Sequence, residues 1–204
     1  MQSSIRQWPS LQFYDDKLED GMNIKERQEL LLPKEICPYS FIHVDGKETF
    51  QNNSRKNENE AGLVVKLIGY LEKVGFTVKE DVGIISFYSG QVELLNQLLG
   101  DAKLPIQSQT VDGFQGEEKD IIIISFVRAN NAGKIGFLDD FRRLNVAVTR
   151  AKRCLIMIGN YESLSYDENH IGSMMKHLLQ NHRIQSETVV EKLISIDFQA
   201  KDEF

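Results

Sequence analysis

The sequence predicts an α/β fold in which a mostly parallel sheet is covered by helices on both faces. Two apolar runs carry this prediction: "DIIIISFV", with consecutive β-branched residues at Ile121–Ile124, and "CLIMIG" at Cys154–Gly159. Neither run alternates polar and apolar residues, which is typical of strands buried on both faces of a parallel sheet. The helix-forming segment "RRLNVAVTRAK" lies between them, and a strand–helix–strand order favours a parallel connection.

The N-terminal segment has no clear period, and its aromatic residues Trp8, Phe13 and Tyr14 are expected to anchor it on the core. The run "SFIHVDGK" then predicts a short strand, Phe41 to Val44, which ends at an Asp-Gly turn. The polar run "QNNSRKNENE" has no apolar period and is expected to form a loop.

A helix is predicted directly after this polar run. Asn57 is a suitable N-cap, and Glu60 three residues later fits a variant of the capping box. Gly75 is expected to end the helix. Apolar residues recur at helical spacing between these limits, at Ala61, Val64, Val65, Ile68 and Leu71. "VGIISF" predicts the next buried strand, and Gln91–Leu99 the next helix.

Length and composition suit one globular domain of ordinary hydrophobicity, with 204 residues and 41% hydrophobic residues. Residues 184–204 are mostly polar and are expected to form a peripheral extension to a domain of residues 1–183. The formal net charge of −6 argues against coating nucleic acid through overall charge, but it allows a local basic groove.

Cellular location is constrained by what the sequence lacks. Its two cysteines, Cys37 and Cys154, are far apart in sequence and have no neighbouring histidine or cysteine cluster, which fits a reducing compartment and gives no metal signature. No run approaches the roughly 18 apolar residues that a membrane span needs. We therefore expect a nuclear or cytoplasmic protein that does not contact membranes.

The first candidate site is "TVDGFQGEEKD", Thr110–Asp120, directly before the central strand. Gly113 and Gly116 permit a tight turn or the close approach of a ligand. Several polar side chains occur in a short space, at Thr110, Asp112, Gln115, Glu117 and Glu118. An ordinary glycine-containing turn with solvated charges explains the spacing equally well.

The second candidate site is the segment "RRLNVAVTRAK". At helical spacing Leu144, Val148 and Ala151 form an apolar stripe for the core, whereas Arg143 and Arg150 project together from another face. Two guanidinium groups on one face suit bidentate contacts with phosphate oxygens. The alternative is a solvated cationic face, or ion pairing with Glu117, Glu118, Asp139 or Asp140.

The third candidate site is "ISFYSGQVELL", where a strand ends and a helix begins. Ser86, Tyr88, Ser89 and Gln91 follow the strand, and ligands of open α/β sheets bind at that end. Ordinary capping of the helix by Ser89 is the alternative. No catalytic set of Ser, His and Asp or of Cys and His is legible. The chain contains no GxxxxGK[ST] and no GxGxxG, which disfavours an independent Rossmann-type nucleotide enzyme.

The order and spacing of these motifs resemble the second RecA-like domain of superfamily 1 helicases of the senataxin and nonsense-mediated-decay type. "SFYSGQ" is similar to helicase motif IV, "TVDGFQGEEKDIIIIS" to motif V and "RRLNVAVTRAK" to motif VI. The pattern SxxNxxE at Ser54, Asn57 and Glu60 and the opening run "MQSSIRQWPSLQFYDDKLEDG" also fit. The resemblance covers roughly residues 1–180 and implies a RecA-like, P-loop NTPase-type fold.

This resemblance implies roles for individual residues around ATP and its Mg²⁺ ion, which bind between two RecA-like domains. Arg150 corresponds to the arginine finger, which reaches the γ-phosphate and stabilises charge in the transition state. The implied ATP-binding residues are Gly116, Glu118, Arg143 and Gln91. The implied contacts with the backbone of single-stranded RNA or DNA are Ser86, Thr110 and Asp112.

The resemblance also implies a partner. The Walker A and Walker B residues and the adenine-reading glutamine belong to the first RecA-like domain, and none occurs in these 204 residues. We expect that domain, in the same or another chain, to supply the Mg²⁺ ligands, and we expect this chain alone to be inactive. Phe87 stands where many members have proline, and Glu117 where many have arginine. A non-catalytic nucleic-acid-binding or regulatory module is the alternative, although the retention of "QGEE" and "TRAK" together favours a helicase.

Overall fold

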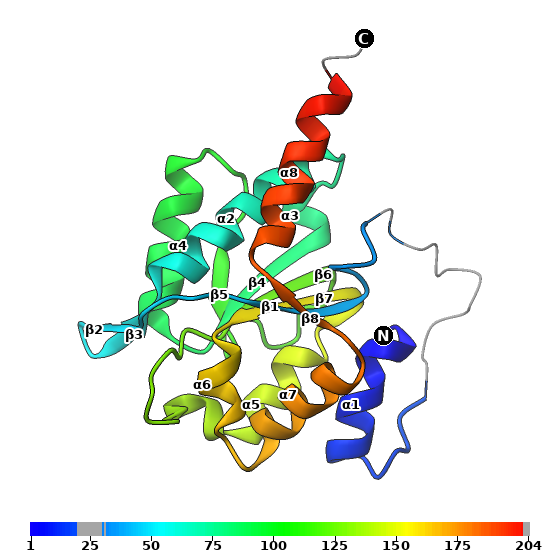
Figure 1. The fold of residues 1–204 in the computed structure, drawn as a ribbon, viewed down its shortest axis with the longest axis vertical. Coiled ribbons are helices and arrows are strands. Elements are labelled where there is room, and N and C mark those ends of the chain that lie inside the picture. Colours follow the sequence, from blue (N-terminus) through cyan, green and yellow to red (C-terminus); the bar gives the residue numbers. More distant parts are fainter. Residues whose placement is uncertain (20–29, 31, 202–204) are drawn as a thin grey trace.

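A six-stranded sheet in the order β5-β4-β6-β7-β1-β8 forms the centre of the protein (Figure 1). The structure, a computed structural model, describes residues 1–19, 30 and 32–201. Each neighbouring pair in this sheet is parallel, which confirms the predicted α/β class. The strands are β1 (Tyr39–His43), β4 (Val82–Ser86), β5 (Ser108–Thr110), β6 (Lys119–Ser125), β7 (Ala151–Gly159) and β8 (Ile184–Ser186).

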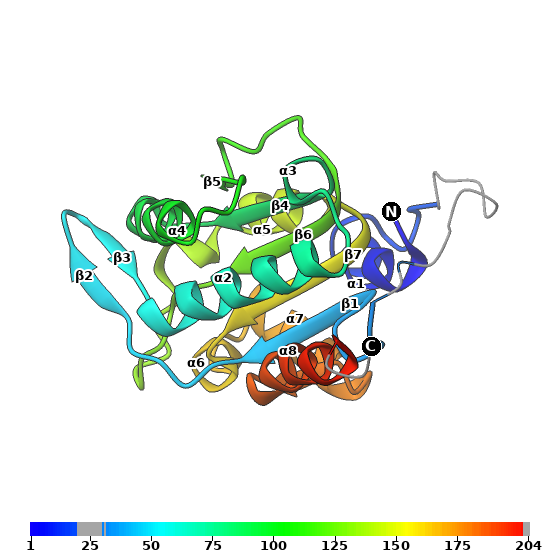
Figure 2. The same ribbon diagram turned by 90° about the horizontal axis from the view of Figure 1, so that it is seen from above.

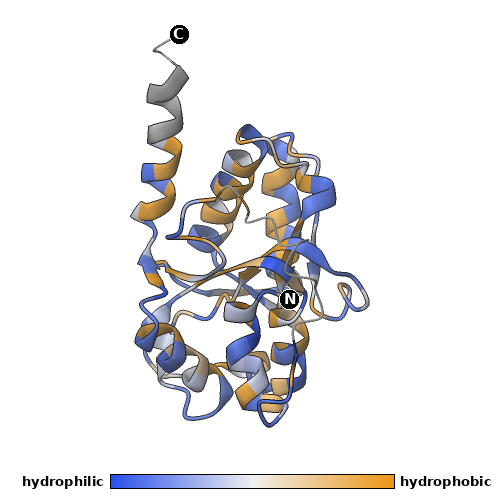
Figure 3. Ribbon diagram, turned by 90° about the vertical axis from the view of Figure 1, so that its right-hand side faces the viewer, coloured by the Kyte–Doolittle hydropathy of each residue, from blue (hydrophilic) through white to orange (hydrophobic). Residues whose placement is uncertain are grey.

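Helices cover both faces of the sheet (Figures 1 and 2). One face carries α2 (Glu58–Lys73), α3 (Val78–Asp81), α4 (Ser89–Asp101) and α8 (Thr188–Lys201). The other face carries α1 (Ser3–Phe13), α5 (Phe141–Val148), α6 (Tyr161–Ser165) and α7 (His170–Gln180), with the short 3₁₀ turn η2 (Gly136–Asp139). The helices on both sides of the sheet carry hydrophobic as well as hydrophilic residues (Figure 3).

The isoleucine run of β6 divides between two cores. Ile121 and Ile123 pack in the cluster beneath α2 and α4, whereas Ile122 and Ile124 pack in the cluster on the opposite face. All four side chains are fully buried. Successive side chains of a strand point to opposite faces, so an unbroken apolar run requires helices on both sides.

The helix α2 begins as the sequence predicts. The side chain of Asn57 accepts a hydrogen bond from the backbone N–H of Glu60 at 3.2 Å. Gly75 follows the last turn with a φ of +100°, a conformation that glycine adopts without strain. The cap and the stop residue were therefore both readable from the sequence.

The predicted loop at residues 51–60 is wrong for its first part. Thr49–Gln51 (β2) and Ser54–Lys56 (β3) pair as an antiparallel hairpin, which projects from the domain (Figure 2). Asn52 and Asn53 both have a positive φ, of 51° and 58°, as the two-residue hairpin turn with that geometry requires. The strands are too short to show an alternating pattern, so only the Asn-Asn pair carried a signal.

The predicted helix around "RRLNVAVTRAK" is also too long. The helix α5 ends at Val148, and Ala151 already belongs to β7. The hydroxyl of Thr149 donates to the carbonyl of Asn145 at 2.7 Å as the chain leaves the helix. Arg143 and Arg150 consequently do not share a helical face, and the residue between them, Ala147, is fully buried.

The ends of the described chain pack on this core. Trp8 in α1 is buried, and the ring of Phe13 stacks on Phe141 with centroids 6.0 Å apart, as expected for an anchoring segment. Near the C-terminus, β8 extends the sheet beside β1, and Val190 of α8 is fully buried. Within the part of the chain that the structure describes, no helix combines the length and hydrophobicity needed to cross a membrane.

Candidate functional site: two edges of one sheet

The strands of the parallel sheet have chemically different ends. The side of the sheet at which the strands end is called the carboxyl edge, and the side at which they begin is called the amino edge. The carboxyl edge, where β4, β5 and β6 end, carries Ser86, Thr110 and Ser125 in register. The amino edge, where β6 and β7 begin, carries Lys119 and Ala151 in register. In Figure 2 the arrowheads of β1 and β6 point toward the side from which the β2–β3 hairpin projects. The predicted ATP and nucleic-acid residues divide between these edges.

The segment "TVDGFQGEEKD" joins the two edges. It leaves the carboxyl edge at Thr110, the last residue of β5, and returns to the amino edge at Lys119, the first residue of β6. Phe114 in its middle is buried in the core on the face of α1 and α5. Gly83 of β4 makes room for this ring, because a Cβ atom there would lie 2.5 Å from Cζ of Phe114.

We expect the substitution Gly83→Ala to displace Phe114 and to lower the free energy of unfolding by about 1–3 kcal/mol, as overpacked cores do. Chemical denaturation of the purified chain measures this loss. Gly69→Ala is the matched control, since a Cβ atom there meets nothing within 4 Å. That helical site should gain up to about 1 kcal/mol from the better helix propensity of alanine. Unchanged stability in Gly83→Ala would contradict this packing role.

Near the carboxyl edge, Arg143 forms a two-point ion pair with Asp112. Its Nη2 and Nε donate to the two carboxylate oxygens at 2.7 and 3.2 Å. The two side chains are 40% and 64% exposed, so solvent screens the pair and its contribution to stability is small. The guanidinium of Arg143 is therefore accessible to another anion at low energetic cost.

At the amino edge, Arg150 is held against the same segment. Its Nε donates to the carbonyl of Val146 at 3.2 Å, and its Nη1 donates to the carbonyl of Glu117 at 3.4 Å. Arg150 is half-buried. Gly116 and Glu118, which flank Glu117 in sequence, are both exposed. Gly116 has a φ of +89°, and a Cβ there would meet open space. An exposed glycine turn, an exposed acidic residue and a positioned guanidinium thus occur along the same edge.

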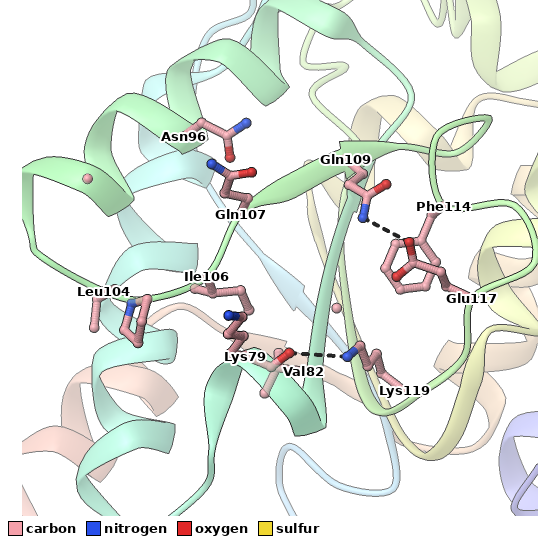
Figure 4. Close-up of a pocket in the computed structure, with 13 residues that line it drawn as sticks. Lys79, Val82, Asn96, Leu104, Ile106, Gln107, Gln109, Phe114, Glu117 and Lys119 are labelled. Carbon is pink, nitrogen blue, oxygen red and sulfur yellow. Dashed lines mark hydrogen bonds between the residues drawn. The ribbon is translucent and has the colours of Figure 1, made fainter.

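The carboxylate of Glu117 is hydrogen-bonded to Gln109. It accepts a hydrogen bond from Nε2 of Gln109 at 3.2 Å, on the wall of a cavity of about 580 Å³ beside β5 (Figure 4). Across this cavity, the amino group of Lys119 donates to the carbonyl of Lys79 at 3.1 Å. Glu117 therefore contacts the arginine only through its backbone.

Gln91 lies at the carboxyl edge, on the opposite side of the sheet from Arg150. Its side-chain oxygen accepts from the backbone N–H of Asn57 at 2.8 Å, and its nitrogen donates to the carbonyl of Asn57 and to Oγ of Ser125. The residue is fully buried. The geometry gives Gln91 the task of joining α4 to the start of α2, and its contact with ATP stays a prediction.

The predicted nucleic-acid residues differ in accessibility. Ser86 is fully buried, and its hydroxyl donates to the carbonyl of Ser125 at 3.0 Å. Thr110 is half-buried and accepts from the backbone N–H of Gly113 at 3.1 Å. Asp112 is exposed. A single-stranded nucleic acid at the carboxyl edge would therefore contact Thr110 and Asp112. Ser86 is not accessible to it and instead joins the ends of β4 and β6.

The sequence motifs missed a strained turn at the end of β6. Val127 has a φ of +71°, and the backbone N–H of Arg128 donates to the carbonyl of Phe126 at 2.8 Å. A γ-turn of this kind is rare and costs about 1–3 kcal/mol, most of all at a β-branched residue. The carboxylate of Glu60 accepts from the N–H of Val127 at 2.8 Å, and Asn57 donates to its carbonyl at 3.3 Å. Burial raises the pKa of Glu60 to about 8.

A second series of hydrogen bonds starts at Arg128, directly after the Val127 turn. The guanidinium of Arg128 is buried and donates to Glu48 at 2.7 Å and to the hydroxyl of Tyr88 at 3.4 Å. Tyr88 in turn donates to the carbonyl of Ile135 at 3.1 Å. Glu48 also accepts from the backbone N–H of Ala129 at 2.9 Å. The only sequence signal for these groups was the SxxNxxE spacing, which places Asn57 and Glu60 but not their partners.

Six parallel strands covered by helices on both faces, with polar and charged side chains at the strand ends, fit the RecA-like α/β fold, whose class binds ligands at such ends. The protein family described as AAA domain matches residues 1–162. The chain therefore belongs to this family, and its relatives place it among helicase domains of the Sen1 and nonsense-transcript-regulator type.

Three curated relatives illustrate the similarity. Helicase sen1 of Schizosaccharomyces pombe is 37% identical over 198 residues, which cover 91% of this chain and 12% of that protein. An ATP-dependent helicase of Methanocaldococcus jannaschii is 37% identical, covering 90% of this chain and 29% of its own length. Regulator of nonsense transcripts 1 of Caenorhabditis elegans is 35% identical, and the match covers 94% of this chain and 18% of that protein. The chain thus spans less than a third of each relative.

Among solved structures, the C-terminal domain of a possible DNA helicase from Lactobacillus plantarum WCFS1 resembles this chain at 14% identity and a TM-score of 0.46. The match covers 79% of this chain and 88% of that one.

Proposed function

We propose that this chain is the second RecA-like domain of an ATP-dependent RNA or DNA helicase and that it supplies the arginine finger, Arg150. The observation that carries the proposal is the placement of Arg150 at the amino edge, fixed by two backbone carbonyls beside the exposed Gly116 and Glu118. The relatives whose names include the word helicase support the same reading.

The groups at the amino edge suit the binding of a nucleoside triphosphate. A guanidinium that is already oriented can stabilise the charge that develops on the γ-phosphate without further reorganisation. The exposed turn at Gly116 leaves room for close approach of the nucleotide, and the exposed carboxylate of Glu118 is the group that we propose accepts hydrogen bonds from the ribose. ATP and Mg²⁺ are the cofactors that we infer, with the Mg²⁺ ligands in a first RecA-like domain of the same or another chain.

Single-stranded RNA or DNA is the partner that we infer for the carboxyl edge, through Thr110 and Asp112. Contacts of these polar groups with the sugar-phosphate backbone would position the strand without reading its sequence. The segment that carries both residues continues to Gly116 and Glu118, so one short stretch of chain links the two ligands. A nuclear or cytoplasmic location is consistent with these partners.

The purified 204-residue chain is expected to hydrolyse no ATP, since no phosphate-cradling loop occurs in it. It is expected to bind single strands, and more weakly as the salt concentration rises. Phosphate release and fluorescence anisotropy of a labelled oligonucleotide measure the two properties. Turnover by this chain that disappears in Arg150→Ala would contradict the first expectation, and the absence of any binding at low salt would contradict the second.

A further inference from the structure

Phe137 is an exposed aromatic residue at the carboxyl edge that the proposed function does not use. Its side chain is 60% exposed. The ring lies against Tyr88, with centroids 5.7 Å apart, and Tyr88 is the second residue after the end of β4. Exposing a phenylalanine ring to water is unfavourable. The contacts beneath the ring therefore indicate whether the fold holds it in this exposed position.

The support is extensive and buried. The phenol of Tyr88 is held between the guanidinium of Arg128 and the carbonyl of Ile135. Gly136, directly before Phe137, has a φ of +58°, and a Cβ there would lie 2.4 Å from Nη1 of Arg128. Only glycine fits this position without displacing the arginine, so the turn that presents the ring is fixed by backbone geometry.

The same support reaches back to the strained turn at the end of β6. Val127 adopts its positive φ because Glu60 and Asn57 hold its N–H and its carbonyl. This turn directs Arg128 inward to Glu48, beneath the Phe137 turn. Strained backbone held by buried side chains is typical of functional positions. Here the buried contacts that begin at Glu60 lead through Arg128 and Tyr88 to the exposed ring of Phe137.

The surroundings of the ring favour a nucleic-acid base over a protein surface. Within residues 134–140 its exposed neighbours are polar or lack a side chain: Lys134, Gly136, Asp139 and Asp140. The next exposed aromatic residue, Phe141, is already in contact with Phe13 and Arg142. A docking surface for a protein needs a contiguous apolar patch, whereas one base needs one flat ring. The ring also shares the carboxyl edge with Thr110 and Asp112, where the single strand is proposed to bind.

We propose that Phe137 is a stacking platform for one base of the single-stranded RNA or DNA that crosses the carboxyl edge. This inference rests on the proposed function and adds a contact with a base to the backbone contacts of Thr110 and Asp112. Every base has a flat π face, so such a contact is tolerant of sequence.

Binding of the purified chain to labelled oligouridylate and oligothymidylate of about 12 nucleotides tests the proposal. We expect Phe137→Ala to weaken binding by about 5- to 150-fold and Phe137→Trp to retain it. An abasic oligomer of equal length should bind both variants equally, because it keeps the phosphates and lacks the bases. Leu179→Ala is the control. Leu179 is 56% exposed at the end of α7, just before β8 enters the sheet at the opposite edge.

The outcomes separate this inference from the proposed function. Wild-type-like binding by Phe137→Ala, or equal weakening on the abasic oligomer, would overturn the stacking role and leave the nucleic-acid site standing. An equal loss in Leu179→Ala would overturn it as well, since any exposed apolar group would then have the same effect. A wild-type chain that binds neither oligonucleotide would overturn the proposed nucleic-acid site together with the platform.

Discussion

Arg150→Ala, introduced into a complete helicase that contains this domain, is expected to lower the rate of ATP turnover by about 10³-fold or more. The guanidinium is fixed by the carbonyls of Val146 and Glu117, so the proposed finger would meet the γ-phosphate without reorganisation if two RecA-like domains close on ATP. Arg150→Lys is expected to restore little activity, because an ammonium lacks the planar fork that contacts two phosphate oxygens. Steady-state phosphate release stimulated by single-stranded nucleic acid measures the effect.

Arg142→Ala is the matched control for this experiment. Arg142 belongs to the same cationic segment, but it is exposed and lies over the ring of Phe141, 5.8 Å from its centroid. Turnover in this variant should stay near the wild-type rate. Both variants should bind single strands nearly as well as the parent protein, since Arg150 lies at the edge away from Thr110 and Asp112. Full turnover in Arg150→Ala would refute the finger and favour a non-catalytic binding module.

The sequence predicted the central part of the fold because burial there leaves a strong compositional trace. A strand covered on both faces must be apolar at consecutive positions, as Ile121–Ile124 and Cys154–Gly159 are. Helix caps were also legible, since Asn57 and Gly75 perform local tasks that few residue types perform. In each case a short-range physical requirement selects the residue.

The errors arose where the outcome depends on distant contacts. Helical spacing extended "RRLNVAVTRAK" to Ala151, but the pairing of Lys119 with Ala151 in the sheet ends the helix earlier. This tertiary constraint moved Arg150 off the helical face that it was expected to share with Arg143. The hydrogen bonds of Gln91 to Asn57 and Ser125 were likewise not foreseen, because they depend on how α2 and α4 meet the strands, and its contact with ATP stays a prediction. No local pattern encodes that meeting.

Removing the carboxylate of Glu60 is expected to be the most damaging change to stability among those considered. Ser125, Val127 and Asn57 all donate to this fully buried group, at 2.7, 2.8 and 3.1 Å. Each buried donor left without an acceptor costs about 1–3 kcal/mol. Glu60→Ala should therefore lower the free energy of unfolding by about 3 kcal/mol or more, measured by chemical denaturation. Glu58→Ala, in the same helical turn, should change it by less than about 0.5 kcal/mol, because Glu58 is exposed.

The same carboxyl group predicts a pH dependence with a definite sign. Burial raises the pKa of Glu60 from 4.5 to about 8, so the folded chain binds a proton that the unfolded chain has released between these values. Stability from this group is complete below about pH 4.5 and falls as the pH rises to about 8, by at most about 1.4 kcal/mol per pH unit. Glu60→Gln cannot ionise and should remove this decline, even where the lost charge alters stability at a single pH.

The comparison of Glu60→Gln with the wild type isolates this contribution from groups of opposite sign. Burial lowers the pKa of His177, so its neutral form favours folding and its contribution is lost as the pH falls. Burial alone would raise the pKa of Glu48, but the charge of Arg128 and the hydrogen bonds from Arg128 and its neighbours together lower it, so its contribution is likewise lost in acid. Both groups remain in the variant. A wild-type and a Glu60→Gln protein with parallel stability curves between pH 4.5 and 8 would show that Glu60 is ionised in the folded chain. The strained turn at Val127 would then be held by a full negative charge.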